Sequence, residues 1–227
     1  MIDPFGSFDW STLHALYDQK CQWFNKGAKY LDFLSYRPES DRELYYLLID
    51  CFARKRLKPY NIDLRIYEAL LYWKLCSQPA AVKNVLELAR SRRNSTYWQN
   101  QLTGLCSSLP ANIERNSKGI TSLVKEFGRF HLFGMRSPDS LPVRTTFLHF
   151  VYPHTVPIFD KMVLKAVGIE DKNANKNFGY LEQYILHVWV LVDKYSSCFP
   201  KSARESPIRM IEMALWSLRG NATRCCH

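Results

Sequence analysis

Apolar residues recur at intervals of three and four positions along nearly the whole chain, which is the spacing of amphipathic α-helices. The alternating apolar and polar pattern of strands, bounded by Asn-Gly or Asp-Gly turns, is missing from the sequence. The clearest helical stripes run from Leu181 to Val192 and from Ile208 to Leu218. The pattern therefore predicts an all-α protein.

Capping residues and helix breakers divide this pattern into about nine or ten helices. Asp63 is a good N-cap for one helix, and Asp160 stands where another begins. Gly27 is a candidate break within the first helical stretch. The other predicted helices follow the same rules, and all of them together cover approximately residues 9–33, 38–56, 63–75, 79–93, 95–109, 117–130 and 145–151, a segment that begins at 160, and residues 181–192 and 208–218.

The clearest break in the helical pattern lies between residues 134 and 143. The run GMRSPDSLPV at these positions contains two prolines and several turn-forming residues. We therefore predict a single globular unit over residues 1–227, built from two interlocked helical lobes that meet near residues 134–143.

The composition is that of a folded protein, with 47% hydrophobic and 23% charged residues in a chain of 227. No stretch approaches the roughly 18 consecutive apolar residues that a membrane span needs, so we expect no membrane partner. The sequence starts with MIDPFGSFDW, which has neither a basic nor an apolar region typical of a secretory signal. The expected location is the cytoplasm, or the nucleoid or nucleus.

The cysteines give no sign of a disulfide framework or a zinc site. There are seven of them, an odd number, and no two have the C-x-x-C spacing. The glycine-rich motifs that bind nucleotide phosphates are missing as well. We therefore expect reduced thiols, no metal and no cofactor.

The charge favours an anionic partner. Thirty-one lysines and arginines against 21 aspartates and glutamates give a net charge of +10, and the excess is spread over both halves of the chain. A field of this sign attracts the phosphate backbone of nucleic acids without reading its sequence. Solubility alone is the other interpretation, and charge does not decide between the two.

Residues 141–168 are the most informative segment, because they place a lone acid between apolar stretches. Asp160 lies at an expected helix start, with Phe159 before it and Lys161 and Met162 after it. Helix amides and the lysine can hold such a carboxylate ionised beside a cavity. An ordinary N-cap is the alternative role, and one aspartate can fill both.

This segment resembles the helix-hairpin-helix DNA glycosylases of the HhH-GPD superfamily. The resemblance is carried by Leu141-Pro142-Val143-Arg144-Thr145-Thr146, an apolar helix, a proline-bearing loop, and then Pro157-Ile158-Phe159-Asp160-Lys161-Met162-Val163. The resemblance implies an all-helical fold of two lobes with the substrate cleft between them. It also implies that Asp160 is the catalytic aspartate, which stabilises the cationic sugar and helps water to attack it.

The sequence departs from the family pattern at the hairpin. Both hairpin glycines are absent, and Arg144 stands near the position of the lysine with which bifunctional members form a Schiff base. An arginine cannot act as an amine nucleophile at neutral pH. The family's four-cysteine iron–sulfur loop is also missing. The resemblance therefore implies a monofunctional hydrolase.

The same resemblance implies that a base is rotated out of the duplex into the cleft, where side chains stack on it. Lys161 and Lys165 are four positions apart on one helix face, so both are candidates to follow a phosphate strand. Each candidate also has a structural interpretation, as a core or packing residue or a solvated charge. The candidate stacking residues are Tyr152, His149, His154 and Trp98, and the candidate DNA-binding residues are Arg144, Thr145, Lys161 and Lys165.

Two functional hypotheses follow. In the first, the chain is a DNA-binding protein that hydrolyses an N-glycosidic bond with Asp160. In the second, it is a non-catalytic helical module that binds nucleic acid or a protein partner. The first predicts that Asp160 lines a cleft with a basic rim, whereas the second predicts that its carboxylate is used only for backbone amides at a convex surface.

Overall fold

The computed structural model describes residues 1–21, 31, 34, 37–55, 62–135 and 141–218. Every regular element in these ranges is helical, which confirms the predicted all-α class. The elements in chain order are η1 (Trp10–Thr12), α1 (Leu13–Lys20), α2 (Asp41–Lys55), α3 (Leu64–Leu75), α4 (Pro79–Ala81), η3 (Val82–Leu86), α5 (Glu87–Ser91), α6 (Thr96–Ser107), α7 (Ser117–Glu126), η4 (Phe127–Arg129), α8 (Leu141–Val151), α9 (Lys161–Ala166), η6 (Ala174–Lys176), α10 (Phe178–Tyr195), η7 (Ser196–Cys198) and α11 (Pro207–Ser217).

The predicted helix starts agree best with the structure where a capping side chain is present. Asp63 caps α3 by accepting hydrogen bonds from the backbone N–H groups of Arg65 and Ile66. The helix expected over residues 79–93 is divided, because the π-helical segment η3 separates α4 from α5. The helix expected to start at residue 145 already begins at Leu141, so part of the expected break is helical. Gly27 and residues 136–140 lie outside the described residues.

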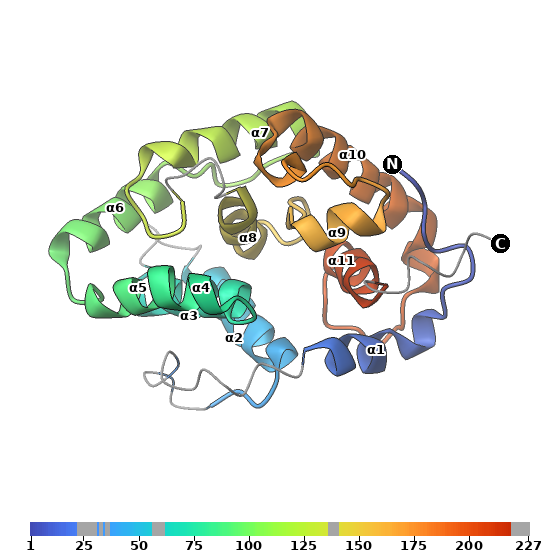
Figure 1. Ribbon diagram of the computed structural model, residues 1–227, viewed down its shortest axis with the longest axis horizontal. Helices are drawn as coiled ribbons and strands as arrows, with labels where there is room; N and C mark the ends of the chain where they lie inside the picture. Colours follow the sequence, from blue (N-terminus) through green and yellow to red (C-terminus); the bar gives the residue numbers. More distant parts are fainter. Residues whose placement is uncertain (22–30, 32–33, 35–36, 56–61, 136–140, 219–227) are drawn as a thin grey trace.

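Helices from the two ends of the chain pack together. α1 lies against α11, and α11 also contacts α9 and α10 (Figure 1). The helices from the middle of the chain include α8, which contacts α2, α3 and α7. α7 packs against α10 and so joins the two groups. The division into two lobes near residues 134–143 stays a prediction.

α8 occupies the centre of the molecule (Figure 1). All of its residues except Pro142 are buried, including Arg144, Thr145 and His149. A helix that is enclosed on every side has no exposed face, so its polar side chains must find partners inside the protein. Although α8 is apolar over most of its length, no described helix is both long enough and apolar enough to cross a membrane.

Candidate functional site

A cavity of about 780 Å³ opens between α3, α11 and the start of α9. The charged residues that line it include both acidic and basic side chains, and those that are exposed to solvent are basic. Lys161 at the first position of α9 and Lys172 and Lys176 beyond it are exposed to solvent. The charged residues that line the cavity are Lys74, Lys161, Lys172, Lys176, Arg209, Asp41, Asp160 and Glu212.

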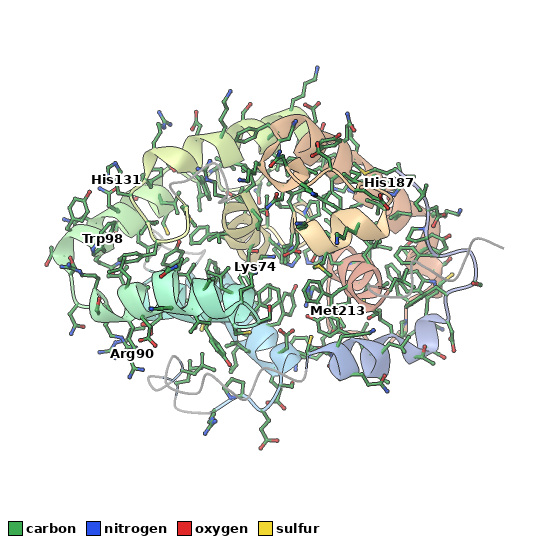
Figure 2. All side chains as sticks on the ribbon, viewed as in Figure 1. Lys74, Arg90, Trp98, His131, His187 and Met213 are labelled. Atoms are coloured by element: carbon green, nitrogen blue, oxygen red, sulfur yellow. The ribbon has the colours of Figure 1, made fainter. Side chains whose placement is uncertain are left out.

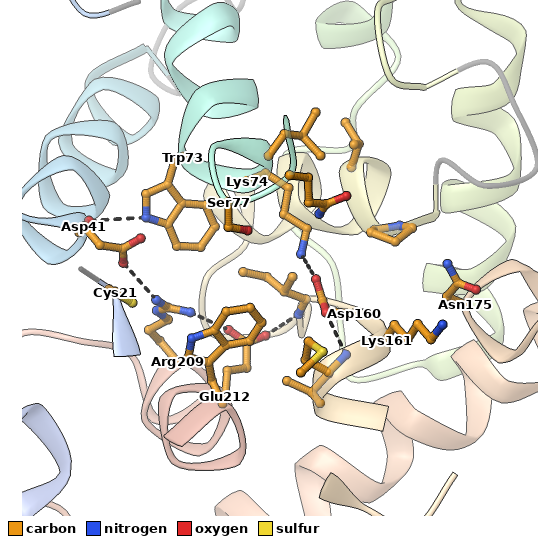
Figure 3. A pocket seen from close by; sticks show the side chains of 18 of the residues that line it. Cys21, Asp41, Trp73, Lys74, Ser77, Asp160, Lys161, Asn175, Arg209 and Glu212 are labelled. Carbon is orange, nitrogen blue, oxygen red and sulfur yellow. Dashed lines mark hydrogen bonds and ion pairs between the residues drawn. The ribbon is translucent and has the colours of Figure 1, made fainter. Parts of the chain in front are cut away.

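Asp160 lies in this cavity and is bound on both of its carboxylate oxygens. Oδ1 accepts a hydrogen bond from the backbone N–H of Met162 at 2.8 Å, which makes Asp160 the N-cap of α9. Oδ2 accepts from Nζ of Lys74 at 2.5 Å (Figure 3). The side chain remains 15% exposed. The carboxylate therefore serves as a cap and also lines a cavity with a basic rim.

Lys74 reaches Asp160 from the last turn of α3. Figure 2 shows the labelled lysine near the middle of the molecule. Only 8% of its side chain is exposed, so the ammonium group is largely removed from water. A buried ammonium needs an anionic or polar partner, and Asp160 supplies one. This ion pair connects α3 with α9 along one wall of the cavity.

The loop that carries Asp160 is held by side chains from two other helices. The backbone N–H of Ile158 donates to Oε1 of Glu212 on α11. The next N–H along the chain, that of Phe159, donates to Oγ1 of Thr145 on α8 at 3.0 Å. These two hydrogen bonds satisfy buried donors on consecutive residues and fix the approach of the chain to Asp160.

A buried arginine forms the deep end of the cavity. The guanidinium carbon of Arg209 lies 5.1 Å from the centre of the Tyr17 ring and 4.9 Å from each of the rings of Tyr45 and Trp73. One of its nitrogens donates to the hydroxyl of Tyr17 at 2.6 Å. Aromatic faces attract a desolvated cation, so the three rings help to hold this charge inside the protein.

Two carboxyl groups accompany Arg209. Asp41 approaches the guanidinium at 3.7 Å and Glu212 at 3.6 Å (Figure 3). Burial raises the pKa of Asp41 above its usual value, and the positive charge of Arg209 acts in the opposite direction. Burial raises the pKa of Glu212 to about 7, again against the effect of Arg209. Glu212 therefore holds its proton to a higher pH than an ordinary glutamate.

The structure leaves two of the candidate DNA-binding residues inside the protein. Arg144 donates from Nε to the carbonyl of Met135 at 2.7 Å and from Nη1 to the carbonyl of Val124 at 3.3 Å. Thr145 donates to the carbonyl of Leu141 at 2.8 Å in addition to accepting from the loop. Because both side chains are buried, neither is placed to contact a phosphate at the surface.

The two candidate lysines of α9 differ in their relation to the cavity. Both Lys161 and Lys165 are exposed, but only Lys161 of the pair lines the cavity. One helical turn separates them, so α9 presents one lysine at the rim and one beside it.

The four candidate stacking residues lie outside the cavity lining. His149 is fully buried and bonds through Nδ1 to the Val156 carbonyl and through Nε2 to the Tyr45 hydroxyl. The Tyr152 hydroxyl donates to the Pro110 carbonyl, and His154 is exposed on the loop after α8. Trp98 packs against Phe133 with their ring centres 4.6 Å apart, at the edge of the molecule (Figure 2). The structure therefore does not bring this set together with Asp160.

Other residues of the cavity were not identified as candidates from the sequence. Trp73 and Trp216 line it with aromatic surface, and Lys74, Arg209 and Glu212 supply charge. Each of these three charged residues interrupts an otherwise apolar helix face, and this interruption is the sequence feature by which they could have been identified. Charged residues are rarely buried without a partner, so such interruptions indicate buried ion pairs or a site.

Over the described part of the chain, no group of three or more His, Cys, Asp or Glu side chains is arranged to hold a metal ion. The carboxyl groups of the cavity are instead close to Lys74 and Arg209. The carboxyl and ammonium groups of the cavity can act as acids and bases in partly desolvated surroundings.

No protein-family model matches the chain, and searches of curated proteins and of solved structures find no significant match either.

Proposed function

We propose that this chain binds DNA and hydrolyses the N-glycosidic bond of a nucleotide that is rotated into the cavity, with Asp160 as the catalytic carboxylate. The observation that carries the proposal is that Asp160 lines a cavity with a basic rim. The Asp160 carboxylate is also not used only for backbone amides, as the non-catalytic alternative predicts, because its second oxygen accepts from Lys74.

The dimensions and the lining of the cavity agree with this role. Its volume of about 780 Å³ falls within the range of small-molecule pockets, so a nucleobase and its sugar can enter it. The partly exposed indole ring of Trp216 offers an apolar face for a base that has left the stack, whereas the buried ring of Trp73 packs against Arg209. The exposed Lys161, Lys172 and Lys176 at the rim can attract the phosphates that flank the rotated nucleotide.

The reaction asks two things of Asp160. As the bond between C1′ and the base breaks, the sugar gains positive charge, and a fixed carboxylate stabilises that charge. The same carboxylate then orients a water molecule toward C1′ and accepts its proton. The hydrogen bonds that the N–H groups of Ile158 and Phe159 donate to Glu212 and Thr145 keep the carboxylate in place during both steps.

The test compares binding to three DNA duplexes of one sequence, measured by fluorescence anisotropy over a series of salt concentrations. One duplex is undamaged, one carries a neutral tetrahydrofuran abasic site, and one carries a pyrrolidine ring whose cationic nitrogen mimics the charged sugar. We expect the wild-type chain to bind the pyrrolidine duplex at least about tenfold more tightly than the tetrahydrofuran duplex, because catalytic sites favour the charge of the transition state.

Asp160→Asn is the decisive variant, because asparagine can still cap α9 but carries no charge. It should reduce the preference for the pyrrolidine duplex to less than about twofold. Asp63→Asn is the matched control, since Asp63 caps α3 in the same way and does not line the cavity. Equal binding to all three duplexes, unchanged by Asp160→Asn, would contradict the proposal. The remaining function would then be that of a non-catalytic basic module for nucleic acid or a protein partner.

A further inference from the structure

We propose that Glu212 is the general acid of this site, and that it donates a proton to the departing base while Asp160 stabilises the sugar. This inference rests on the proposed hydrolysis of an N-glycosidic bond. It assigns different tasks to two carboxyl groups that line one cavity.

The two carboxyl groups belong to the lining of one cavity. Glu212 holds the backbone N–H of Ile158, which is two residues before Asp160. Both side chains line the cavity, and the buried hydroxyl of Tyr184 lies within range of both charges. Hydrolysis of a glycosidic bond commonly uses two such carboxyl groups, one for the leaving group and one for the sugar.

The two oxygens of Glu212 are used differently. Oε1 accepts the hydrogen bond from Ile158, whereas Oε2 makes no hydrogen bond to any described residue. Oε2 is 3.6 Å from Nη1 of Arg209, which is too long for a hydrogen bond. A buried carboxyl oxygen without a donor is where a proton is best accommodated, because the charged form is poorly solvated there.

The surroundings of the two groups favour opposite protonation states. Asp160 receives hydrogen bonds from an ammonium group and a backbone amide, and both stabilise a carboxylate. Burial raises the pKa of Glu212 to about 7, so this group keeps its proton to a higher pH than an ordinary glutamate. Carboxyl groups whose environments separate their protonation states in this way are typical of acid and base pairs.

The proposed step conserves atoms and charge. The bond between C1′ and the base nitrogen breaks, its electron pair moves to the base, and the proton of Glu212 moves to a ring nitrogen of the base. The cationic sugar then gains the oxygen of water at C1′, the proton of that water passes to Asp160 and from there to solvent, and the Glu212 carboxylate takes up a proton from solvent. The products are a neutral free base and an abasic sugar with a hydroxyl group at C1′.

The pH dependence of this step reflects all the charged and titratable groups that face Glu212. Arg209 on α11 and Lys74 on α3 act on it with positive charge. The buried hydroxyls of Tyr45 on α2 and Tyr184 on α10 also lie within range. The pKa of each of these two tyrosines is raised by burial, so neither adds a negative charge near pH 7. Base release that needs Glu212 should therefore decline as the pH rises above about 7.

The experiment compares two leaving groups. One duplex contains 7-methyl-2′-deoxyguanosine, whose base is cationic and departs without a further proton. The other contains 2′-deoxyinosine at the same position, whose neutral base benefits from protonation. Release of each base is followed by chromatography under single-turnover conditions for the wild-type chain, Glu212→Gln and Asp41→Asn.

We expect Glu212→Gln to slow the release of hypoxanthine by about 100-fold or more, the usual effect of a lost general acid. The release of 7-methylguanine should change by less than about fivefold, because no proton is needed. The variant should also abolish the decline of hypoxanthine release above neutral pH. Asp41→Asn disturbs the same arginine without removing the proposed donor, so any effect should be equal for both bases.

Three results would overturn the inference. Equal loss of both activities in Glu212→Gln would make this residue a support of the Asp160 loop and nothing more. Unchanged release of hypoxanthine would exclude proton donation by Glu212. Absence of release from both duplexes by the wild-type chain would remove the reaction itself. In the first two cases the proposed hydrolysis by Asp160 stands, so the failures of the two proposals can be told apart.

Discussion

Nζ of Lys74 lies 2.5 Å from Oδ2 of Asp160, so the end of α3 is bound to the start of α9 across 86 positions of sequence. The contact brings an ammonium group to a carboxylate that caps a helix inside the cavity. It holds the carboxylate oxygen toward α3 and gives the buried lysine its partner. Stability and site geometry therefore depend on the same pair.

Replacement of Lys74 by methionine should lower the free energy of unfolding by about 2 to 3 kcal/mol, because Asp160 would keep a poorly hydrated charge without a partner. Asp160→Asn should also destabilise the chain, since the ammonium group would then be unpaired. The double variant should be less destabilised than the sum of the two, with a coupling of at least about 1 kcal/mol. Urea unfolding of the four proteins measures this coupling. Additive effects would show that the pair contributes nothing of its own.

Glu212 should make the folded state less stable as the pH rises from about 4.5 to about 7. Its pKa is about 7 in the folded chain and near 4.5 when unfolded, so the folded state binds the extra proton in this interval. The slope contributed by one proton is about 1.4 kcal/mol per pH unit. In Glu212→Gln this contribution should disappear, and the variant should gain stability relative to the wild type toward pH 8. Urea midpoints measured between pH 4.5 and 8 give the slope, and parallel curves for both proteins would contradict the prediction.

His149 should make the folded state less stable as the pH falls, the opposite of the effect of Glu212. Burial lowers its pKa to about 3, whereas the unfolded chain protonates near 6.5. The unfolded state therefore binds the extra proton below pH 6.5, and stability is lost as the pH falls toward 3. His149→Asn, which removes the titrating ring, should flatten this loss although it lowers stability at pH 7. Unfolding curves between pH 3.5 and 7 test the sign, and an equally steep acid loss in the variant would assign the effect to other groups.

The features that could be predicted from the sequence are those set by neighbouring residues. Apolar spacing is a local property, and it correctly predicted the all-α class. Capping depends on one side chain and the next few amides, which is why Asp63 and Asp160 were both located at helix starts. The π-helical segment η3 gave no such signal, because its residues also fit an ordinary helix.

Of the residues that line the cavity, only Asp160 and Lys161 could be identified as candidates from the sequence. Lys74, Arg209 and Glu212 reach it from helices that are far apart in sequence, and only the tertiary packing brings them together. His149 and Tyr152 are close to Asp160 along the chain, but His149 lies on the enclosed helix α8 and Tyr152 follows it, and both side chains are buried in the core.

Arg144 is a candidate DNA-binding residue whose side chain is buried in the structure, beside Gly128. Its guanidinium occupies space beside Gly128, where an added Cβ would lie 2.9 Å from Nη2. The absence of a side chain at Gly128 lets the arginine fold inward and bond to main-chain carbonyls. Nothing in the local sequence around Arg144 indicates this arrangement.

The two lysines of α9 provide a test of the proposed DNA contact at the rim of the cavity. Lys161 lines the cavity and Lys165 lies one turn further along, and both are exposed. If the backbone of a rotated nucleotide passes the rim, Lys161→Gln should reduce the slope of log K against log salt by about one, the value for one lost phosphate contact. Lys165→Gln, which removes the same charge from the same helix, should change the slope clearly less. Anisotropy titrations with the pyrrolidine duplex at several salt concentrations measure both slopes. Equal changes would indicate that α9 contributes only to the general field of the protein, because a defined path past the cavity requires that the two positions differ.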